Sequence, residues 1–171
     1  MLAFDGRSTG RVGALRNANY HLIRLALAIP VFLILAPCAF AGTVTETASK
    51  WGLIGRWSLD CSLPPDHDRG TVLIYQAARD DRLVFRRNFG DASDDNEVVG
   101  AKVSADGMLN LRVFFPSLKE MREYGLMKQP DGSIRAMYNR SRKGEYTIKH
   151  GEFTANGNPT PPQYKCTQQR G

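Results

Sequence analysis

The chain has 171 residues and a formal net charge of +6, a length that allows one domain with a modest hydrophobic core. Four of its 23 basic residues and one of its 17 acidic residues lie within residues 1–41, which leaves 19 basic and 16 acidic residues in the other 130. An excess of three positive charges is far below the strongly basic character of a nucleic-acid-binding domain, so we expect no nucleic-acid partner.

Residues 1–41 have the three-part pattern of a secretory signal peptide. Four arginines precede an apolar run over residues 25–36, and the tripeptide Ala-Phe-Ala that ends at Ala41 places small residues where signal peptidase reads them. The sequence predicts a signal helix over 1–41, cleavage after Ala41, and a single mature domain over 42–171 that is periplasmic or secreted. The alternative is an uncleaved anchor, but two prolines interrupt the run, so we expect no membrane anchor after cleavage.

Cys61 and Cys166 are the two cysteines of the predicted mature chain. Exported proteins form and keep disulfides, because the compartments outside the cytoplasm are oxidising. We therefore expect a disulfide that joins the first strand to the C-terminal tail across 105 residues. A redox-active pair would be closer in sequence, as in a Cys-x-x-Cys motif.

Short segments with alternating apolar residues recur along the mature chain at intervals of roughly 8 to 12 residues, as in all-β domains. Threonines and a serine after residue 42 also predict one or two turns of helix before the first strand. Asp106-Gly107 predicts a two-residue hairpin turn in which both residues have positive φ. The predicted strands cover residues 55–61, 71–78, 82–89, 97–104, 108–115, 119–128, 133–140 and 145–153.

These eight strands have short connections and no room for crossover helices. Consecutive antiparallel pairing is therefore the simplest topology, and the fold class is all-β. An up-and-down barrel of about eight strands leaves no unpaired edge and has room for one small ligand. A two-sheet β-sandwich is the alternative.

The first strand opens with Gly55-Arg56-Trp57, which follows the predicted helical turn and precedes the series of hairpins. This opening resembles the Gly-x-Trp motif of lipocalins and the wider calycin group, with Gly55 and Trp57 as the fold signature. The spacing from Trp57 to Cys61, together with the terminal Cys166, is also similar to small exported bacterial proteins of unknown function. The resemblance implies a barrel that holds a small apolar or amphipathic molecule.

Three residues are candidates for ligand binding. Arg87 shares a strand face with the apolar residues of 82–89, while Tyr138 and Arg140 continue the inward face predicted for 133–140. A buried guanidinium requires an anionic partner. For Arg87 the sequence leaves open a ligand carboxylate, an internal pair with Glu123, or solvent if the strand register is shifted by one residue.

Other clusters of polar residues indicate no catalytic or metal site. Asp66-His67-Asp68 and the acidic stretch 91–97 are interpreted as solvated loops, since a metal site needs three or four convergent ligands. No nucleophile motif accompanies the lone His150, so we expect neither a cofactor nor an enzyme.

Two functional hypotheses remain from different classes. One is an exported binding protein with a small-molecule ligand inside the barrel. The other is an envelope structural or interaction protein in which the same aromatic side chains only fill the core. A hydrolase would need a cleft with convergent acid and base groups, which the sequence does not indicate.

Overall fold

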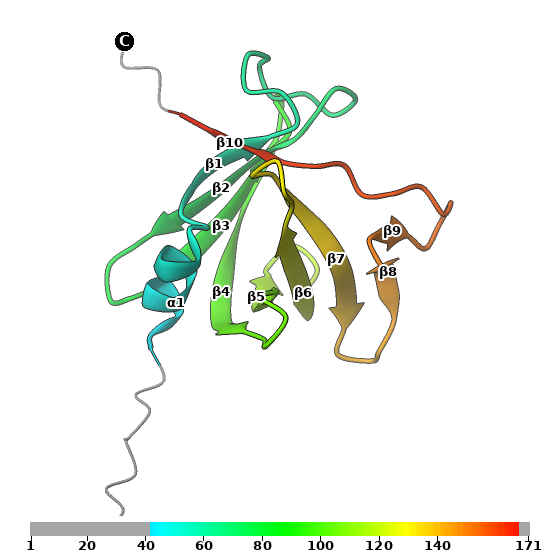
Figure 1. Ribbon diagram of the computed structural model, residues 1–171. Coiled ribbons are helices and arrows are strands. Elements are labelled where there is room, and N and C mark those ends of the chain that lie inside the picture. The colour runs from blue at the N-terminus through cyan, green and yellow to red at the C-terminus, as the bar shows by residue number, and fades with distance from the viewer. Residues whose placement is uncertain (1–41, 168–171) are drawn as a thin grey trace, which may run out of the picture. The chain divides into compact units, whose positions relative to one another are not determined.

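The computed structural model describes residues 42–167, and the predicted signal peptide lies outside these residues. The domain consists of one short helix and ten antiparallel strands that form one curved sheet (Figure 1). The all-β prediction is confirmed. The elements are α1 (Val44–Trp51), β1 (Gly55–Ser58), β2 (Val72–Ala77), β3 (Leu83–Asn88), β4 (Ser93–Val103), β5 (Leu109–Phe115), β6 (Glu120–Lys128), β7 (Ile134–Ser141), β8 (Tyr146–Lys149), β9 (Glu152–Phe153) and β10 (Tyr164–Cys166).

The strands pair in the order β10-β1-β2-β3-β4-β5-β6-β7-β8-β9, so every chain neighbour from β1 to β9 is also a neighbour in the sheet. Within the described chain no pairing joins β9 to β10, and the ladder does not close into a barrel. A single bridge brings the ends closer: Gln163, beside β10, exchanges two backbone hydrogen bonds of 2.8 and 2.9 Å with Ile134 of β7. The sheet therefore curves far enough for one C-terminal segment to contact both β1 and β7.

The strand count exceeds the predicted eight for two reasons. The segment predicted as one strand over 145–153 is split by His150 and Gly151, both with positive φ (55° and 79°), into β8 and β9. A short extended segment near the C-terminus pairs with β1 and forms a further strand, β10. His150 therefore lies in a tight turn and not on a strand face.

The turn at Asp106-Gly107 exists, but its predicted geometry is wrong. Only Gly107 has positive φ (84°), and the N–H of Ser104 bonds to the carbonyl of Met108 at 2.9 Å across a three-residue loop. Ser104 Oγ donates to the Asp106 carboxylate at 2.5 Å, which stabilises this longer turn. Asp106 therefore contributes as a hydrogen-bond acceptor, without the left-handed conformation that the two-residue turn requires.

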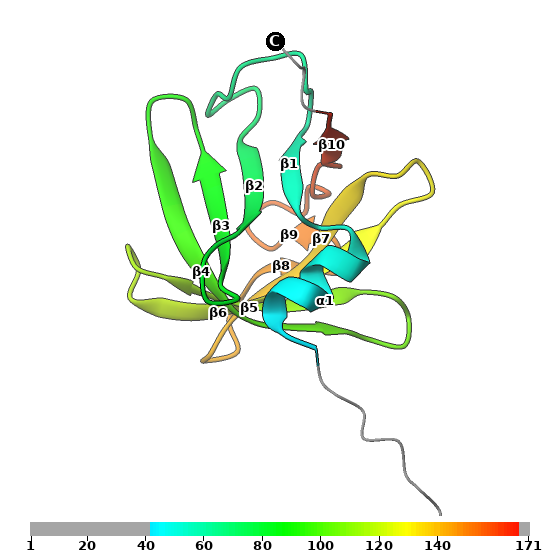
Figure 2. The same cartoon turned by 90° about the vertical axis from the view of Figure 1, so that its left-hand side faces the viewer.

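The predicted helical turn before the first strand is confirmed as α1. Thr43 caps its N-terminus by accepting a bond from the N–H of Glu46, and Gly52 ends it with a left-handed residue. The helix packs against β4 (Figure 2). Trp51 Nε1 donates to the Gly107 carbonyl at 2.9 Å. Because Trp51 is buried, α1 covers the end of the sheet that carries the β4–β5 turn.

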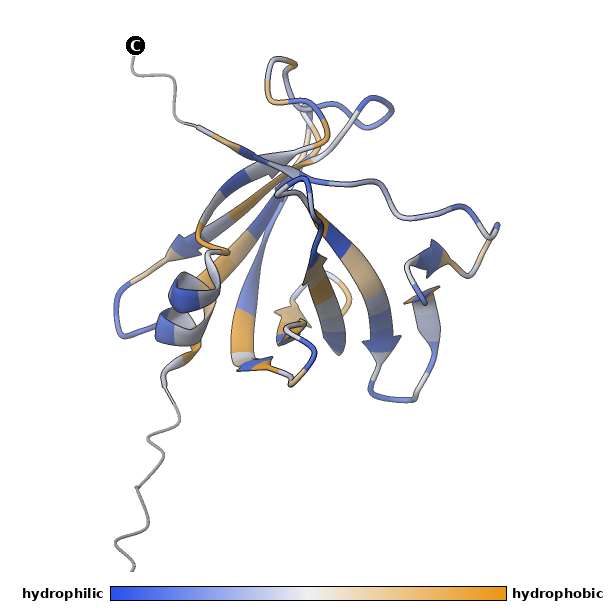
Figure 3. Ribbon diagram, viewed as in Figure 1, coloured by the Kyte–Doolittle hydropathy of each residue, from blue (hydrophilic) through white to orange (hydrophobic). Residues whose placement is uncertain are grey.

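The core lies on the inner face of the sheet and follows the strand period. In β5 the residues Leu109, Leu111, Val113 and Phe115 are each at most 1% exposed, while the residues between them point outward. Trp57 of β1 is also buried, and its Nε1 donates to the Leu53 carbonyl at 2.7 Å. Hydrophilic residues concentrate in the turns outside this core (Figure 3).

A β-bulge in β7 changes which residues face inward. Gly125 of β6 pairs with Tyr138 and Leu126 pairs with Ala136, so Met137 is an extra residue without a partner. An inserted residue reverses the alternation beyond it. Ala136 faces the core, but after the bulge Asn139 faces the core and Tyr138 faces outward.

The predicted disulfide is confirmed. Cys61 follows β1 and Cys166 ends β10, and their sulfurs are bonded across a separation of 105 residues. The cross-link joins two strands that also pair directly through Arg56 and Cys166. A disulfide is compatible with an oxidising periplasmic or extracellular location. Among residues 42–167 no helix is both long enough and apolar enough to cross a bilayer.

Candidate functional site

An open cleft of about 330 Å³ lies on the inner face of the sheet. Its walls come from strands at both ends of the sheet order and from the segment before β10, so no single hairpin builds it. Most of the lining is apolar: Leu73, Phe85, Phe89, Leu126, Ile134, Ala136, Ile148, Phe153 and Pro161. The polar lining residues are Thr71, Arg87, Tyr124, Asn139, Thr147, Thr160 and Gln163.

Among the described residues that line the cleft, Arg87 is the only charged one. It faces inward with Leu83 and Phe85, as the alternation predicts, and its side chain is 29% exposed. Its partner is Asp94, directly opposite on β4, whose carboxylate accepts bonds from Nε at 2.9 Å and from Nη2. Within the described chain, Glu123 is bonded to Arg140 and not to Arg87.

The Arg87–Asp94 pair is stable as two charged groups. Burial raises the pKa of Asp94, but the bonds from Arg87 and Asn96 together outweigh burial and hold that pKa below its usual value. The guanidinium carbon also lies 4.9 Å from the ring centre of Phe115 and 5.5 Å from that of Phe89. The cleft therefore contains a cation that an internal carboxylate already neutralises.

Tyr124 places a hydroxyl beside this pair. Its ring contacts Phe85 edge-on at 6.3 Å and Phe115 at 5.9 Å between ring centres. Burial raises the pKa of the Tyr124 hydroxyl, and the nearby Arg87 partly offsets this effect. The phenol is therefore a neutral hydrogen-bonding group at neutral pH, next to an aromatic wall.

Asn139, turned inward by the bulge in β7, joins the cleft to a second arginine. Its Oδ1 accepts a bond of 2.6 Å from Nε of Arg122, whose Nη1 lies 3.0 Å from the Glu120 carboxylate. The Arg122 side chain is 12% exposed, so its partners replace most of its water contacts. Two neutralised arginine–carboxylate pairs therefore lie close to the cleft.

Sequence reasoning found Arg87 but missed Asp94, Tyr124 and Asn139. The acidic stretch that was interpreted as a loop becomes strand from Ser93 onward, where Asp94 and Asp95 lie opposite two arginines of β3. The signal was present: Arg86-Arg87 and Asp94-Asp95 are placed symmetrically about the β3–β4 turn. Asn139 left no such signal, because its orientation depends on the bulge.

The structure does not bring the three predicted ligand-binding residues together. Arg87 lines the inner cleft, whereas Tyr138 and Arg140 lie on the outer face because the bulge at Met137 reverses the alternation. Tyr138 donates its hydroxyl to Asn110 at 2.7 Å on that outer face.

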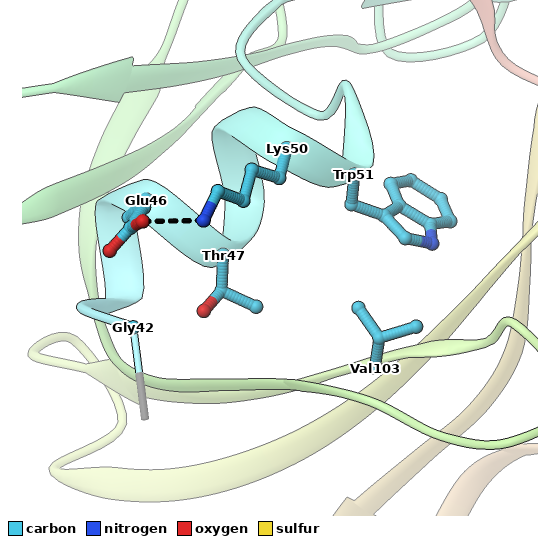
Figure 4. Close-up of a pocket in the computed structure, with 6 residues that line it drawn as sticks. All are labelled: Gly42, Glu46, Thr47, Lys50, Trp51 and Val103. Atoms are coloured by element: carbon cyan, nitrogen blue, oxygen red, sulfur yellow. Dashed lines mark hydrogen bonds and ion pairs between the residues drawn. The ribbon is translucent and has the colours of Figure 1, made fainter. Parts of the chain in front are cut away.

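Two other features contain paired polar groups that satisfy each other. A hollow of about 370 Å³ beside α1 is lined by Glu46 and Lys50, whose side chains bond at 2.5 Å, and by Trp51 (Figure 4). In the β1–β2 loop, the Asp66 carboxylate accepts bonds from the side chain and the backbone N–H of Arg69. These bonds lower the pKa of Asp66 to about 2. His67 stacks on a phenylalanine ring.

Among residues 42–167 no group of three or more His, Cys, Asp or Glu side chains is arranged to hold a metal ion. The inner cleft is therefore the candidate site that combines an apolar wall with convergent polar groups. In comparisons with protein-family profiles, curated proteins and solved structures, no match to the chain was found.

Proposed function

We propose that this protein is an exported binding protein that holds a small apolar or amphipathic molecule in the inner cleft. The observation that supports the proposal is the cleft itself, where Phe85, Phe89 and Ile148 form an apolar wall beside Arg87 and Tyr124. Its volume of about 330 Å³ lies at the small end of the range for small-molecule sites. Export is supported by the disulfide and by the signal-like sequence of residues 1–41.

The proposal includes the calycin-like architecture that the Gly55-x-Trp57 opening resembles. The sheet order is that of an up-and-down meander, and the bridge between Ile134 and Gln163 draws its two ends together. A ligand between these ends would contact β3 on one side and β7 on the other.

The Arg87–Asp94 pair determines which ligands fit. Because Asp94 neutralises Arg87, a neutral molecule with one hydrogen-bonding group is accommodated without an unpaired charge. A ligand carboxylate would have to compete with Asp94 for the guanidinium. We therefore expect alcohols to bind the native protein better than acids of the same chain length.

The first experiment is a thermal-shift and calorimetry screen of decanol, decanoic acid and aromatic alcohols on the full chain. We expect at least one alcohol to stabilise the protein, and Ala136→Trp, which fills the cleft, to abolish this effect. Ser117→Trp, in an exposed turn, is the matched control and should bind as the native protein does. If no compound stabilises the native protein, or if Ala136→Trp leaves binding unchanged, the cleft is not the ligand site.

The second experiment tests the role of the ion pair. In Asp94→Asn the guanidinium of Arg87 loses its carboxylate, so the affinity for decanoic acid should rise by about tenfold while that for decanol changes little. An equal change for both compounds would show that the ion pair does not control selectivity.

The alternative function, an envelope structural protein with a filled core, is favoured by one observation. The inner face already contains continuous aromatic packing, in which Tyr75 stacks on Phe85 at 4.6 Å between ring centres. A screen without any ligand would favour this alternative.

A further inference from the structure

The outer face of strands β4 to β8 carries two shallow hollows that meet at Tyr138. One, of about 360 Å³, is lined by Arg140, Tyr146 and Lys149 among others. The second, of about 340 Å³, includes Lys102 and Arg112. Because Tyr138 lines both hollows, they form one continuous surface, which we name the basic face: Lys102, Arg112, Arg140 and Lys149 around Tyr138.

Two glycines shape this surface. A Cβ built on Gly125 would lie 2.3 and 2.4 Å from carbons of the Tyr138 ring, so the ring lies directly against the backbone of β6. A Cβ on Gly100 would lie 2.9 Å from Nε of Arg112, whose guanidinium likewise lies across β4. The aromatic ring and the cation are therefore held flat on the sheet, which leaves the hollows open beside them.

The charge on the basic face is strongly unbalanced. Of the residues that line the two hollows, four are basic and one, Glu123, is acidic. That carboxylate is bonded to Arg140. Within residues 42–167, no carboxylate lies within ion-pair distance of Lys102, Arg112 or Lys149. The basic face therefore has an excess of three positive charges. Beyond residue 41 the whole sequence has 19 basic and 16 acidic residues, which is the same excess, so the numbers of basic and acidic residues are equal outside the basic face.

We propose that the basic face binds an acidic polysaccharide, with carboxylates at the unpaired cations and sugar rings against Tyr138. An extended polyanion can reach cations in both hollows at once, which a single small anion cannot. The Glu123 carboxylate, which accepts one bond from Arg140, can accept further hydrogen bonds from sugar hydroxyls. The disulfide is compatible with an oxidising compartment, where such polymers and not nucleic acids are the usual polyanions.

The test measures binding of the full chain to polygalacturonate, with neutral dextran of similar length as the reference. We expect the protein to bind polygalacturonate and not dextran. The affinity for polygalacturonate should fall steeply between about 50 mM and about 200 mM NaCl, because salt screens cation–anion contacts. The triple variant Lys102→Gln, Arg112→Gln, Lys149→Gln should lose at least about tenfold in affinity. The single reversal Lys149→Glu tests the same surface with less change to the sheet.

The matched control removes the same charge elsewhere, in Arg79→Gln, Arg82→Gln, Lys119→Gln, all exposed positions away from the basic face. This control should keep its affinity within about twofold of the native value. An equal loss in both triple variants would mean that net charge alone drives binding and would overturn the proposal. Equal or tighter binding of a single-stranded oligodeoxynucleotide, or of anionic lipid vesicles, would overturn the choice of a polysaccharide.

Discussion

Trp57 shows how one residue connects the sequence pattern to the core. It is 3% exposed, packs within the inner cluster and satisfies its indole N–H at the Leu53 carbonyl. That bond ties the start of β1 to the segment that follows α1, so the residue fixes the helix relative to the sheet.

Trp57→Ala should therefore lower the free energy of unfolding by ~3 to 5 kcal/mol, the range for removal of a large buried aromatic side chain. Arg142→Ala, in the exposed β7–β8 turn, is the control and should cost under ~0.5 kcal/mol. Urea denaturation followed by circular dichroism measures both. Equal unfolding midpoints would contradict the placement of Trp57 in the core.

Asp94 gives a second residue-scale prediction, on the dependence of stability on pH. Its pKa is lower in the folded protein than in the unfolded chain, where it is about 4. The stabilisation from its ionised form is therefore complete above the unfolded pKa and is lost as the pH falls through the lower folded pKa. The stability difference between the native protein and Asp94→Asn should shrink as the pH is lowered from about 6 to about 2.

Urea denaturation at a series of pH values measures this difference. Asp68→Asn, in the exposed β1–β2 loop, is the control and should show little difference from the native protein over the same series. A difference between native protein and Asp94→Asn that stays constant with pH would show that the ion pair does not determine the effect of the substitution.

At the scale of elements, β10 is held both by the cross-link and by its pairing with β1. It has three residues, pairs with β1 alone and ends at Cys166. The segment before it lines the cleft through Thr160, Pro161 and Gln163. Local bonds support the same segment, since Thr160 Oγ1 donates to the Ala136 carbonyl at 2.9 Å. The disulfide therefore acts mainly on the unfolded chain, and the segment has contacts of its own in the folded protein.

Replacement of both cysteines by serine should lower the free energy of unfolding by up to about 4 to 5 kcal/mol, the chain-entropy value for a loop of this length. At low temperature this variant should bind the same ligands in the cleft as the native protein does, because the hydrogen bonds that hold the segment before β10 remain. Denaturation with and without a thiol reductant provides the same comparison in the native sequence. Identical midpoints in both conditions would contradict a stabilising role for the disulfide.

At the scale of the whole molecule, the two faces of one sheet carry different chemistry. The inner face combines an apolar wall with neutralised ion pairs, whereas the outer face of β4 to β8 has unpaired cations around an aromatic ring. Each strand of this region contributes to both faces, because successive side chains point to opposite sides. The two proposed sites are therefore back to back, and a substitution in one can leave the other intact.

The sequence by itself determined the features that depend on local pattern and on simple counting. Alternation placed Trp57 and the residues of β5 in the core, and turn residues separated the strands. The two cysteines beyond the predicted signal peptide indicated one pair, which the disulfide confirms. Short connections predicted consecutive antiparallel pairing, which the sheet order from β1 to β9 confirms. These predictions hold because each depends on neighbours in the chain or on a covalent bond.

Only the tertiary structure decided the features that depend on which strands lie opposite each other. The bulge at Met137 arises from the pairing of β6 with β7, and it moves Tyr138 and Arg140 to the outer face while Asn139 enters the cleft. The partner of Arg87 likewise depends on the register of β3 against β4, which places Asp94 opposite it. A shift of one residue exchanges the two faces of a strand, and local pattern cannot report such a shift because the inserted residue shows no distinct signal in the sequence.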